Sequence, residues 1–120
     1  MRDLRGAWRD EYERTLGLRP ADDNQGCLQD GHWAAGMFGY FSTYALGNLA
    51  AAQLYDAARA AEPGLELALE RGDFGPLRAW LRVQVHGHGS THGFFERVRI
   101  ATGQDLSIAP LVRLLEGRYL

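Results

Sequence analysis

Side chains able to donate or accept a proton gather in residues 26–47, which read GCLQDGHWAAGMFGYFSTYALG. His32, Tyr40 and Tyr44 stand there among glycines and large aromatic residues. A glycine-rich backbone can turn polar side chains toward an apolar cleft, and functional residues are common in such segments. The pattern therefore places the candidate chemistry of this chain in residues 26–47.

Each of these residues also has a purely structural interpretation. His32 can be a buried, hydrogen-bonded histidine beside Trp33, and Asp30 can cap or turn a loop. Tyr40 and Tyr44 are four residues apart, which would place both on one helix face as packing residues. The residues alone leave both interpretations open.

Three histidines near residue 90 form a second group of side chains that can bind metals. On a helix, His86 and His88 would lie about 200° apart and could not face one ion. His88 and His92 are four residues apart, but the glycines around them disfavour a helix. We therefore predict a surface loop here and no metal site in this chain.

Composition excludes several classes of function. The chain has 120 residues, a formal net charge of −2 and 13 basic residues, all of them arginine and none clustered. Nucleic-acid binding needs a basic face, so we expect no nucleic-acid partner. No apolar run approaches the ~20 residues of a membrane helix, and the charged first residues do not resemble a signal peptide. With a single cysteine, the default expectation is a cytoplasmic protein that does not bind membranes.

Helical periodicity and its breaks predict an all-α fold, with residues 1–120 folded as a single unit. Almost no stretch alternates as a strand would. Residues 21–31 are polar and irregular, and Gly36 and Gly39 make a regular helix improbable before about residue 40. We expect about six helices, at residues 3–16, 43–61, 65–70, 74–85, 94–102 and 107–116.

The expected helix at residues 43–61 is unusually apolar. Its polar residues Asn48, Gln53, Asp56 and Arg59 occupy an arc of roughly 140°, which leaves about 220° for small or apolar side chains. Such a helix should be buried on most sides. A chain of this length has few helices to cover it, which suggests that it belongs to something larger.

Two ordered motifs connect the chain to a known family. Residues 26–33 match the pattern GxxQDxHW, and GYF, TY and LG follow at residues 39–47. These residues resemble the M32 zinc metallocarboxypeptidases, the carboxypeptidase Taq family. GDF-x-PL at residues 72–77 and HxHG at residues 86–89 are similar to the C-terminal region of that family. The resemblance covers the whole chain and implies a fold like the C-terminal part of the helical M32 enzymes.

The resemblance also implies roles for individual residues. Peptide hydrolysis passes through a tetrahedral oxyanion that needs hydrogen-bond donors. His32, with Tyr40 or Tyr44, is implied as a catalytic donor to it. The implied substrate-binding residues are Gln29, Asp30, Trp33 and Phe38. The first two would orient the histidine or contact the substrate backbone, and the two aromatic residues would line the cleft.

One part of the family pattern is absent from this sequence. M32 enzymes hold zinc through an HExxH helix and a downstream glutamate, and no HExxH occurs here. The resemblance therefore implies no cofactor in this chain, with zinc belonging to the full-length family.

Three functional interpretations follow. The chain is the C-terminal part of a zinc-dependent carboxypeptidase that removes C-terminal amino acids from peptides and is inactive by itself. Alternatively, it is a helical interaction module or a self-associating fragment. In the third interpretation it is one half of a split carboxypeptidase, which binds a peptide substrate only when complemented by an upstream catalytic half.

Overall fold

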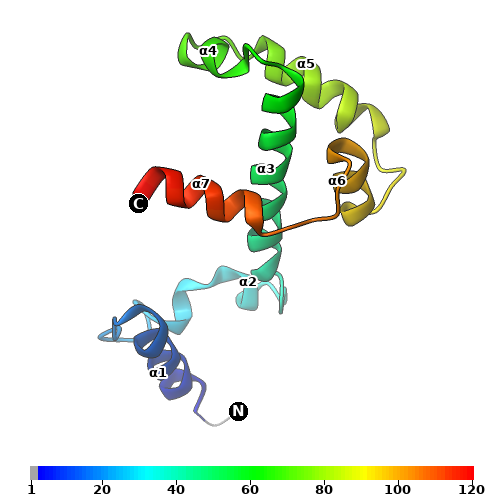
Figure 1. Cartoon of the computed structure of the whole chain (residues 1–120). Helices are drawn as coiled ribbons and strands as arrows, with labels where there is room; N and C mark the ends of the chain where they lie inside the picture. The colour runs from blue at the N-terminus through cyan, green and yellow to red at the C-terminus, as the bar shows by residue number, and fades with distance from the viewer. Residues whose placement is uncertain (1–2) are drawn as a thin grey trace. The chain divides into compact units, whose positions relative to one another are not determined.

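The computed structural model describes residues 3–120, and within that range the chain is all-α (Figure 1). It has seven α-helices and two short 3₁₀ turns there, and no strand. The helices are α1 (Leu4–Leu16), α2 (Gly31–Ala34), α3 (Ser42–Ala61), α4 (Leu65–Glu70), α5 (Gly75–Gln84), α6 (Phe94–Thr102) and α7 (Ala109–Tyr119). The turns are η1 (Cys27–Gln29) and η2 (His86–His88). None of the helices in the described range is long and apolar enough to cross a membrane.

The predicted all-α fold is confirmed, and the six predicted helices lie close to where they were expected. The prediction missed α2, a single turn that lies between the polar loop and the glycines. Periodicity cannot detect a helix of four residues, because one turn contains no repeat. The expectation of no helix between the polar loop and about residue 40 was therefore wrong.

The chain divides into two compact units, Met1–Ser42 and Thr43–Leu120. We describe each by itself, and a single folded unit over residues 1–120 stays a prediction.

In the first unit, the loop after α1 folds back onto that helix. Asp23 forms ion pairs with Arg5 at 3.0 Å and with Arg9 at 3.1 Å. Gly26 packs so closely that an added Cβ would lie 3.1 Å from the Asp22 carbonyl oxygen and 3.5 Å from the Trp8 ring. The first glycine of the motif is thus fixed by close packing, directly before the residues that carry the candidate chemistry.

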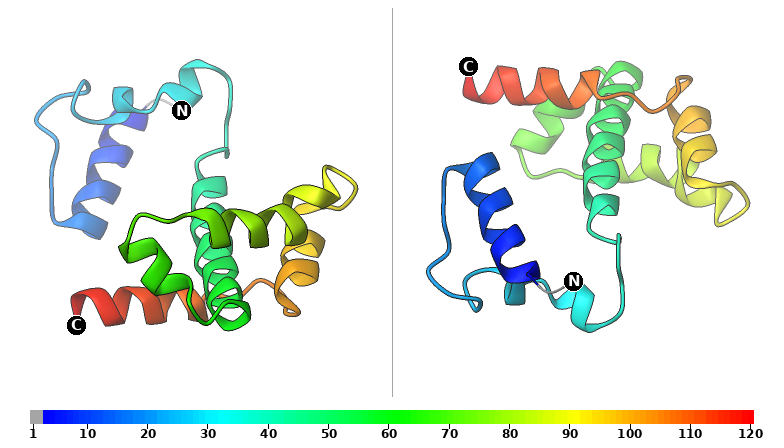
Figure 2. Two further views of the ribbon diagram at one scale, coloured as in Figure 1. Left: turned by 90° about the horizontal axis from the view of Figure 1, so that it is seen from above. Right: turned by 90° about the horizontal axis from the view of Figure 1, so that it is seen from below.

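In the second unit, α5 packs against α3 in the core, Gln53 of α3 bonds to Thr102 of α6, and Asp56 of α3 pairs with Arg113 of α7 (Figure 2). The buried core consists of Ala58 from α3, Leu65 from α4 and Trp80 from α5. Trp80 lies on the face of α5 that packs into this core, together with the half-buried Leu77 and Leu81. This cluster therefore joins three consecutive helices through one apolar core.

The prediction that the helix at residues 43–61 is buried on most sides is wrong for these 120 residues. Within α3 only Ala50, Ala52, Gln53 and Ala58 are buried. Residues 49–58 of α3 are buried or half-buried except Ala51, whereas most residues at the two ends of the helix are exposed. The wide apolar arc of this helix predicts a large buried area, and the other helices of this chain bury only part of that area.

Gln53 was assigned to the polar face of α3, yet it is buried, with 4% of its surface exposed. Its amide nitrogen donates to Thr102 Oγ1 at 3.0 Å and to the Asp105 carbonyl at 3.1 Å, and its oxygen accepts the Ser107 N–H at 2.9 Å. One side chain therefore satisfies backbone groups of the α6–α7 connection. Because a buried amide without partners is costly, these bonds fix where that connection crosses α3.

We predict that Gln53→Leu lowers the free energy of unfolding of the second unit by about 2–3 kcal/mol, because it leaves backbone groups of the connection unpaired. The exposed Asn48→Leu, on the same helix, is the matched control and should change stability by no more than about 0.5 kcal/mol. Thermal or urea unfolding followed by far-UV circular dichroism measures both variants. Equal stability of the two would contradict the assigned role of Gln53.

Candidate functional site

Asp30 holds His32 in place through a single carboxylate oxygen. Asp30 Oδ1 accepts the backbone N–H of His32 at 2.8 Å and lies 2.6 Å from Nδ1 of the same residue. The first bond caps α2, so the capping interpretation of Asp30 is confirmed. The second fixes the ring, which means that one residue both starts the helix and orients the histidine.

These contacts shift the proton equilibrium of the carboxylate. The pKa of Asp30 is lowered from its ordinary value of 3.8, mainly by the hydrogen bond from the His32 backbone N–H. Desolvation opposes the shift, and the hydrogen bond and charge of the His32 ring add to it. A carboxylate at Nδ1 keeps the proton on that nitrogen. The neutral ring then presents Nε2 as an acceptor, and the protonated ring presents an Nε2–H donor.

Two aromatic residues lie against the His32 ring. Tyr40 stacks on it with ring centroids 5.3 Å apart, and Phe41 meets it edge-on at 5.7 Å. Gly36 and Gly39 adopt positive φ angles of 73° and 75°, which let the chain reverse between residues 32 and 40. The same two glycines that disfavour a helix therefore allow the turn that brings His32 and Tyr40 together.

Tyr40 lies in a turn before α3, so the interpretation that Tyr40 and Tyr44 share one helix face is wrong. Tyr44 belongs to the first turn of α3, in the second unit, and is 53% exposed. Its catalytic role stays a prediction.

The other predicted site residues of the first unit make separate contacts. Trp33 and Phe38 stack with their centroids 6.4 Å apart, and Phe38 is 75% exposed. The Gln29 side-chain amide donates to the Asn24 carbonyl, which places it on the loop and not on His32. The aromatic pair therefore lies beside the His32 cluster in sequence and keeps an exposed face, whereas Gln29 stabilises the loop that leads to α2.

Phe41 is the residue that sequence reasoning missed. It stands in the GYF run, next to Tyr40, but a phenylalanine offers no hydrogen bond and so gave no chemical signal. Its edge contact with His32 appears only once the chain has reversed.

The histidines near residue 90 lie around η2 and the start of α6. The His88 and His92 rings are 5.8 Å apart, and His92 Nδ1 lies 3.5 Å from Glu96 Oε2. Within residues 3–120, no three His, Cys, Asp or Glu side chains are arranged to hold a metal ion. The donor set of the described chain thus does not fit a zinc site.

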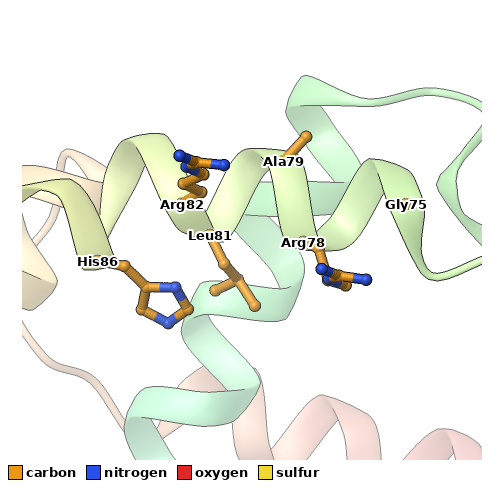
Figure 3. Close-up of a pocket in the computed structure, with 6 residues that line it drawn as sticks. All are labelled: Gly75, Arg78, Ala79, Leu81, Arg82 and His86. Atoms are coloured by element: carbon orange, nitrogen blue, oxygen red, sulfur yellow. The ribbon is translucent and has the colours of Figure 1, made fainter.

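An open pocket of about 550 Å³ lies along α5 (Figure 3). Its lining includes the cationic side chains Arg78 and Arg82, with His86 at one end and Leu81 between them. No residue of the GxxQDxHW motif lines it. Sequence reasoning did not single out these arginines, because two arginines four residues apart are ordinary on an exposed helix.

Comparison with known proteins identifies the family. The family model for the carboxypeptidase Taq (M32) metallopeptidases matches residues 1–119. The chain belongs to this family, and the resemblance found in its motifs is confirmed.

Several curated carboxypeptidases are similar along nearly the whole chain. It is 41% identical to thermostable carboxypeptidase 1 of Pyrococcus furiosus over 119 residues, which are 99% of this chain and 24% of that protein. It is also 41% identical to carboxypeptidase 1 of Bacillus subtilis, of which it covers 23%. The chain thus spans about a quarter of the length of these relatives.

Solved structures share the fold. An M32 carboxypeptidase from Deinococcus radiodurans R1 superimposes with a TM-score of 0.92 at 46% identity, covering 98% of this chain and 24% of that one. A Pyrococcus furiosus carboxypeptidase superimposes with a TM-score of 0.93 at 41% identity, again over 24% of its length. The helices described above are therefore one quarter of a larger helical fold in these relatives.

The lowered pKa of Asp30 leads to a prediction about pH. The carboxylate contributes fully to holding the α2 turn above its ordinary pKa of 3.8, and that contribution disappears as the pH falls through the lower pKa of the folded state. Carbon-13 NMR of the Asp30 carboxyl should show a midpoint below 3.8, and the His32 amide signal should move with the same midpoint. Asp30→Asn should abolish that movement of the amide signal. A carboxyl midpoint at or above the ordinary value would contradict the assigned contacts.

Proposed function

We propose that this chain forms one wall of the active site of a metallocarboxypeptidase that removes C-terminal amino acids from peptides. The observation that carries the proposal is the Asp30–His32–Tyr40 cluster, which lies on the motif shared with the family. His32 and Tyr40 are the hydrogen-bond donors proposed for the oxyanion, and Tyr44 is the alternative tyrosine. Trp33 and Phe38 are the proposed cleft residues.

The position of Asp30 supports a defined role for His32. When water adds to a peptide carbonyl, negative charge develops on the carbonyl oxygen. A protonated His32, with Asp30 at Nδ1, can donate from Nε2 to that oxygen, and the Tyr40 hydroxyl is a second donor. Asp30 acts through His32 and is a positioning residue. The zinc ion that defines the family would have to be held by another stretch of polypeptide.

By itself, the chain should therefore be inactive. Purified residues 1–120, dialysed against zinc, should hold less than about one tenth of an equivalent of the metal, because their donors do not converge. They should release no amino acid from a peptide. Elemental analysis and an amino-acid release assay measure both properties. Stoichiometric zinc together with metal-dependent release would overturn this prediction.

The proposed site can be tested in a complete enzyme. In a chimera, residues 1–120 replace the matching quarter of Bacillus subtilis carboxypeptidase 1, and we expect that chimera to hydrolyse peptides. His32→Ala and Tyr40→Phe should each lower kcat by roughly 10²–10³-fold, as the loss of one oxyanion donor does. Asp30→Asn should lower kcat with a smaller effect on KM, because the His32 ring loses the carboxylate that orients it.

Matched substitutions control for general damage to the chimera. His92→Ala and Tyr119→Phe replace the same residue types outside the family motifs and should leave kcat within about twofold. If the motif variants retain full activity in a chimera that is itself active, the proposed donors are wrong.

A second candidate function is self-association, as an interaction module. Large apolar side chains are exposed on several described helices, among them Phe74, Val83, Phe95 and Ile108 at 57–65%. Exposed apolar surface of this kind commonly mediates contacts between proteins. Light scattering of the purified chain tests this candidate, and a monodisperse monomer would count against it. A cytoplasmic location is part of the main proposal and rests on composition alone.

A further inference from the structure

Phe41 contacts His32 in an orientation that differs from that of Tyr40. The Tyr40 ring lies nearly parallel to the imidazole, at an angle of 25°, with the ring centroids 5.3 Å apart. The Phe41 ring lies nearly perpendicular to it, at 85°, with the centroids 5.7 Å apart. Both separations fall within the range of about 4.5–7 Å over which aromatic rings attract one another. Two rings of different orientation therefore contact one imidazole.

The backbone before α3 brings both rings to the histidine. Gly39 has a positive φ of 75°, and its carbonyl accepts the hydroxyl of Ser42 at 2.9 Å. Both features are local to the turn that contains the two aromatic residues. Because Tyr40 and Phe41 are consecutive, one turn presents both rings to His32, and a movement of one ring is coupled to a movement of the other.

Together with Asp30, these rings define the orientation of the imidazole. The last torsion of a histidine side chain has broad preferences, so the plane of the ring must be fixed by its surroundings. A half-turn about the Cβ–Cγ bond keeps that plane, but it replaces Nδ1 by a carbon and loses the 2.6 Å contact with Asp30 Oδ1. The carboxylate thus selects one of two half-turn states, and the aromatic rings fix the plane. Nε2 is then the ring nitrogen that can face a substrate.

Tyr40 by itself leaves one movement of the imidazole open. Two stacked rings can tilt together and stay parallel, and Tyr40 lies in a turn with 45% of its surface exposed. A perpendicular ring opposes this joint tilt, because the tilt changes the angle at which it meets the imidazole. We propose that Phe41 is a positioning residue, whose ring holds the His32 imidazole so that Nε2 keeps one direction. The catalytic consequence rests on the proposed function, whereas the contact between the two rings does not.

NMR of the 120-residue chain tests the contact. Nuclear Overhauser effects should connect the ring protons of His32 with those of Phe41. Phe41→Leu keeps an apolar side chain without a ring, so the His32 ring signals should move and the Overhauser effects between His32 and Tyr40 should weaken. Phe41→Tyr keeps the ring and should retain these effects. Phe94→Leu removes another phenylalanine that meets an aromatic ring edge-on, and this matched control should leave the His32 signals unchanged.

The chimera with Bacillus subtilis carboxypeptidase 1 tests the catalytic consequence. Phe41→Leu should lower kcat about tenfold and change KM by less than about twofold, because a misdirected donor weakens the transition state and not the binding of substrate. Phe41→Tyr should keep kcat within about twofold of the parent chimera. Phe94→Leu should leave both constants within about twofold. Circular dichroism checks that each variant is folded.

Several results would overturn the proposal. These are no Overhauser effect between the rings of His32 and Phe41, unchanged effects between His32 and Tyr40 in Phe41→Leu, and equal kcat of Phe41→Leu and Phe94→Leu in an active chimera. A raised KM with unchanged kcat would also overturn it, because Phe41 would then be a substrate contact. Failure of the proposed function is a separate result, in which His32→Ala keeps full activity. The NMR measurement needs no activity, so it decides the contact even if the chimera is inactive.

Discussion

Helix α3 carries more small and apolar surface than the helices of its own unit cover. Of its 20 residues only four are buried, three of them alanines. The burial of apolar surface is the main force that holds helices together, so the exposed ends of α3 are a constraint on the whole chain. In the relatives, the matched quarter belongs to a much longer polypeptide. The exposed apolar side chains are consistent with a surface that other helices can cover.

A small number of contacts hold the helices of the second unit together. Ala58, Leu65 and Trp80 join α3, α4 and α5 through apolar packing. Gln53 joins α3 to the α6–α7 connection through hydrogen bonds to groups about 50 residues away in sequence. Apolar packing fixes which helices meet, and the buried amide fixes the position of the chain that crosses them.

The candidate site residues of the first unit lie close together in the sequence. Asp30, His32 and Tyr40 lie within eleven residues of one another and are brought together by a one-turn helix and two glycines with positive φ. The printed contacts that join these three residues therefore all come from one short stretch of polypeptide.

The sequence by itself determined the helical class, six of the seven described helices, the family and the residues worth testing. Those conclusions rest on periodicity, glycine and proline positions, and ordered motifs, all of which are local. Only the tertiary structure decided that Gln53 is buried, that Tyr40 lies in a turn, that Phe41 meets His32 and that the two ends of α3 stay exposed. The physical reason is that each of these depends on which surfaces meet after the chain reverses, and a hydrogen bond across 50 residues leaves no local pattern in the sequence.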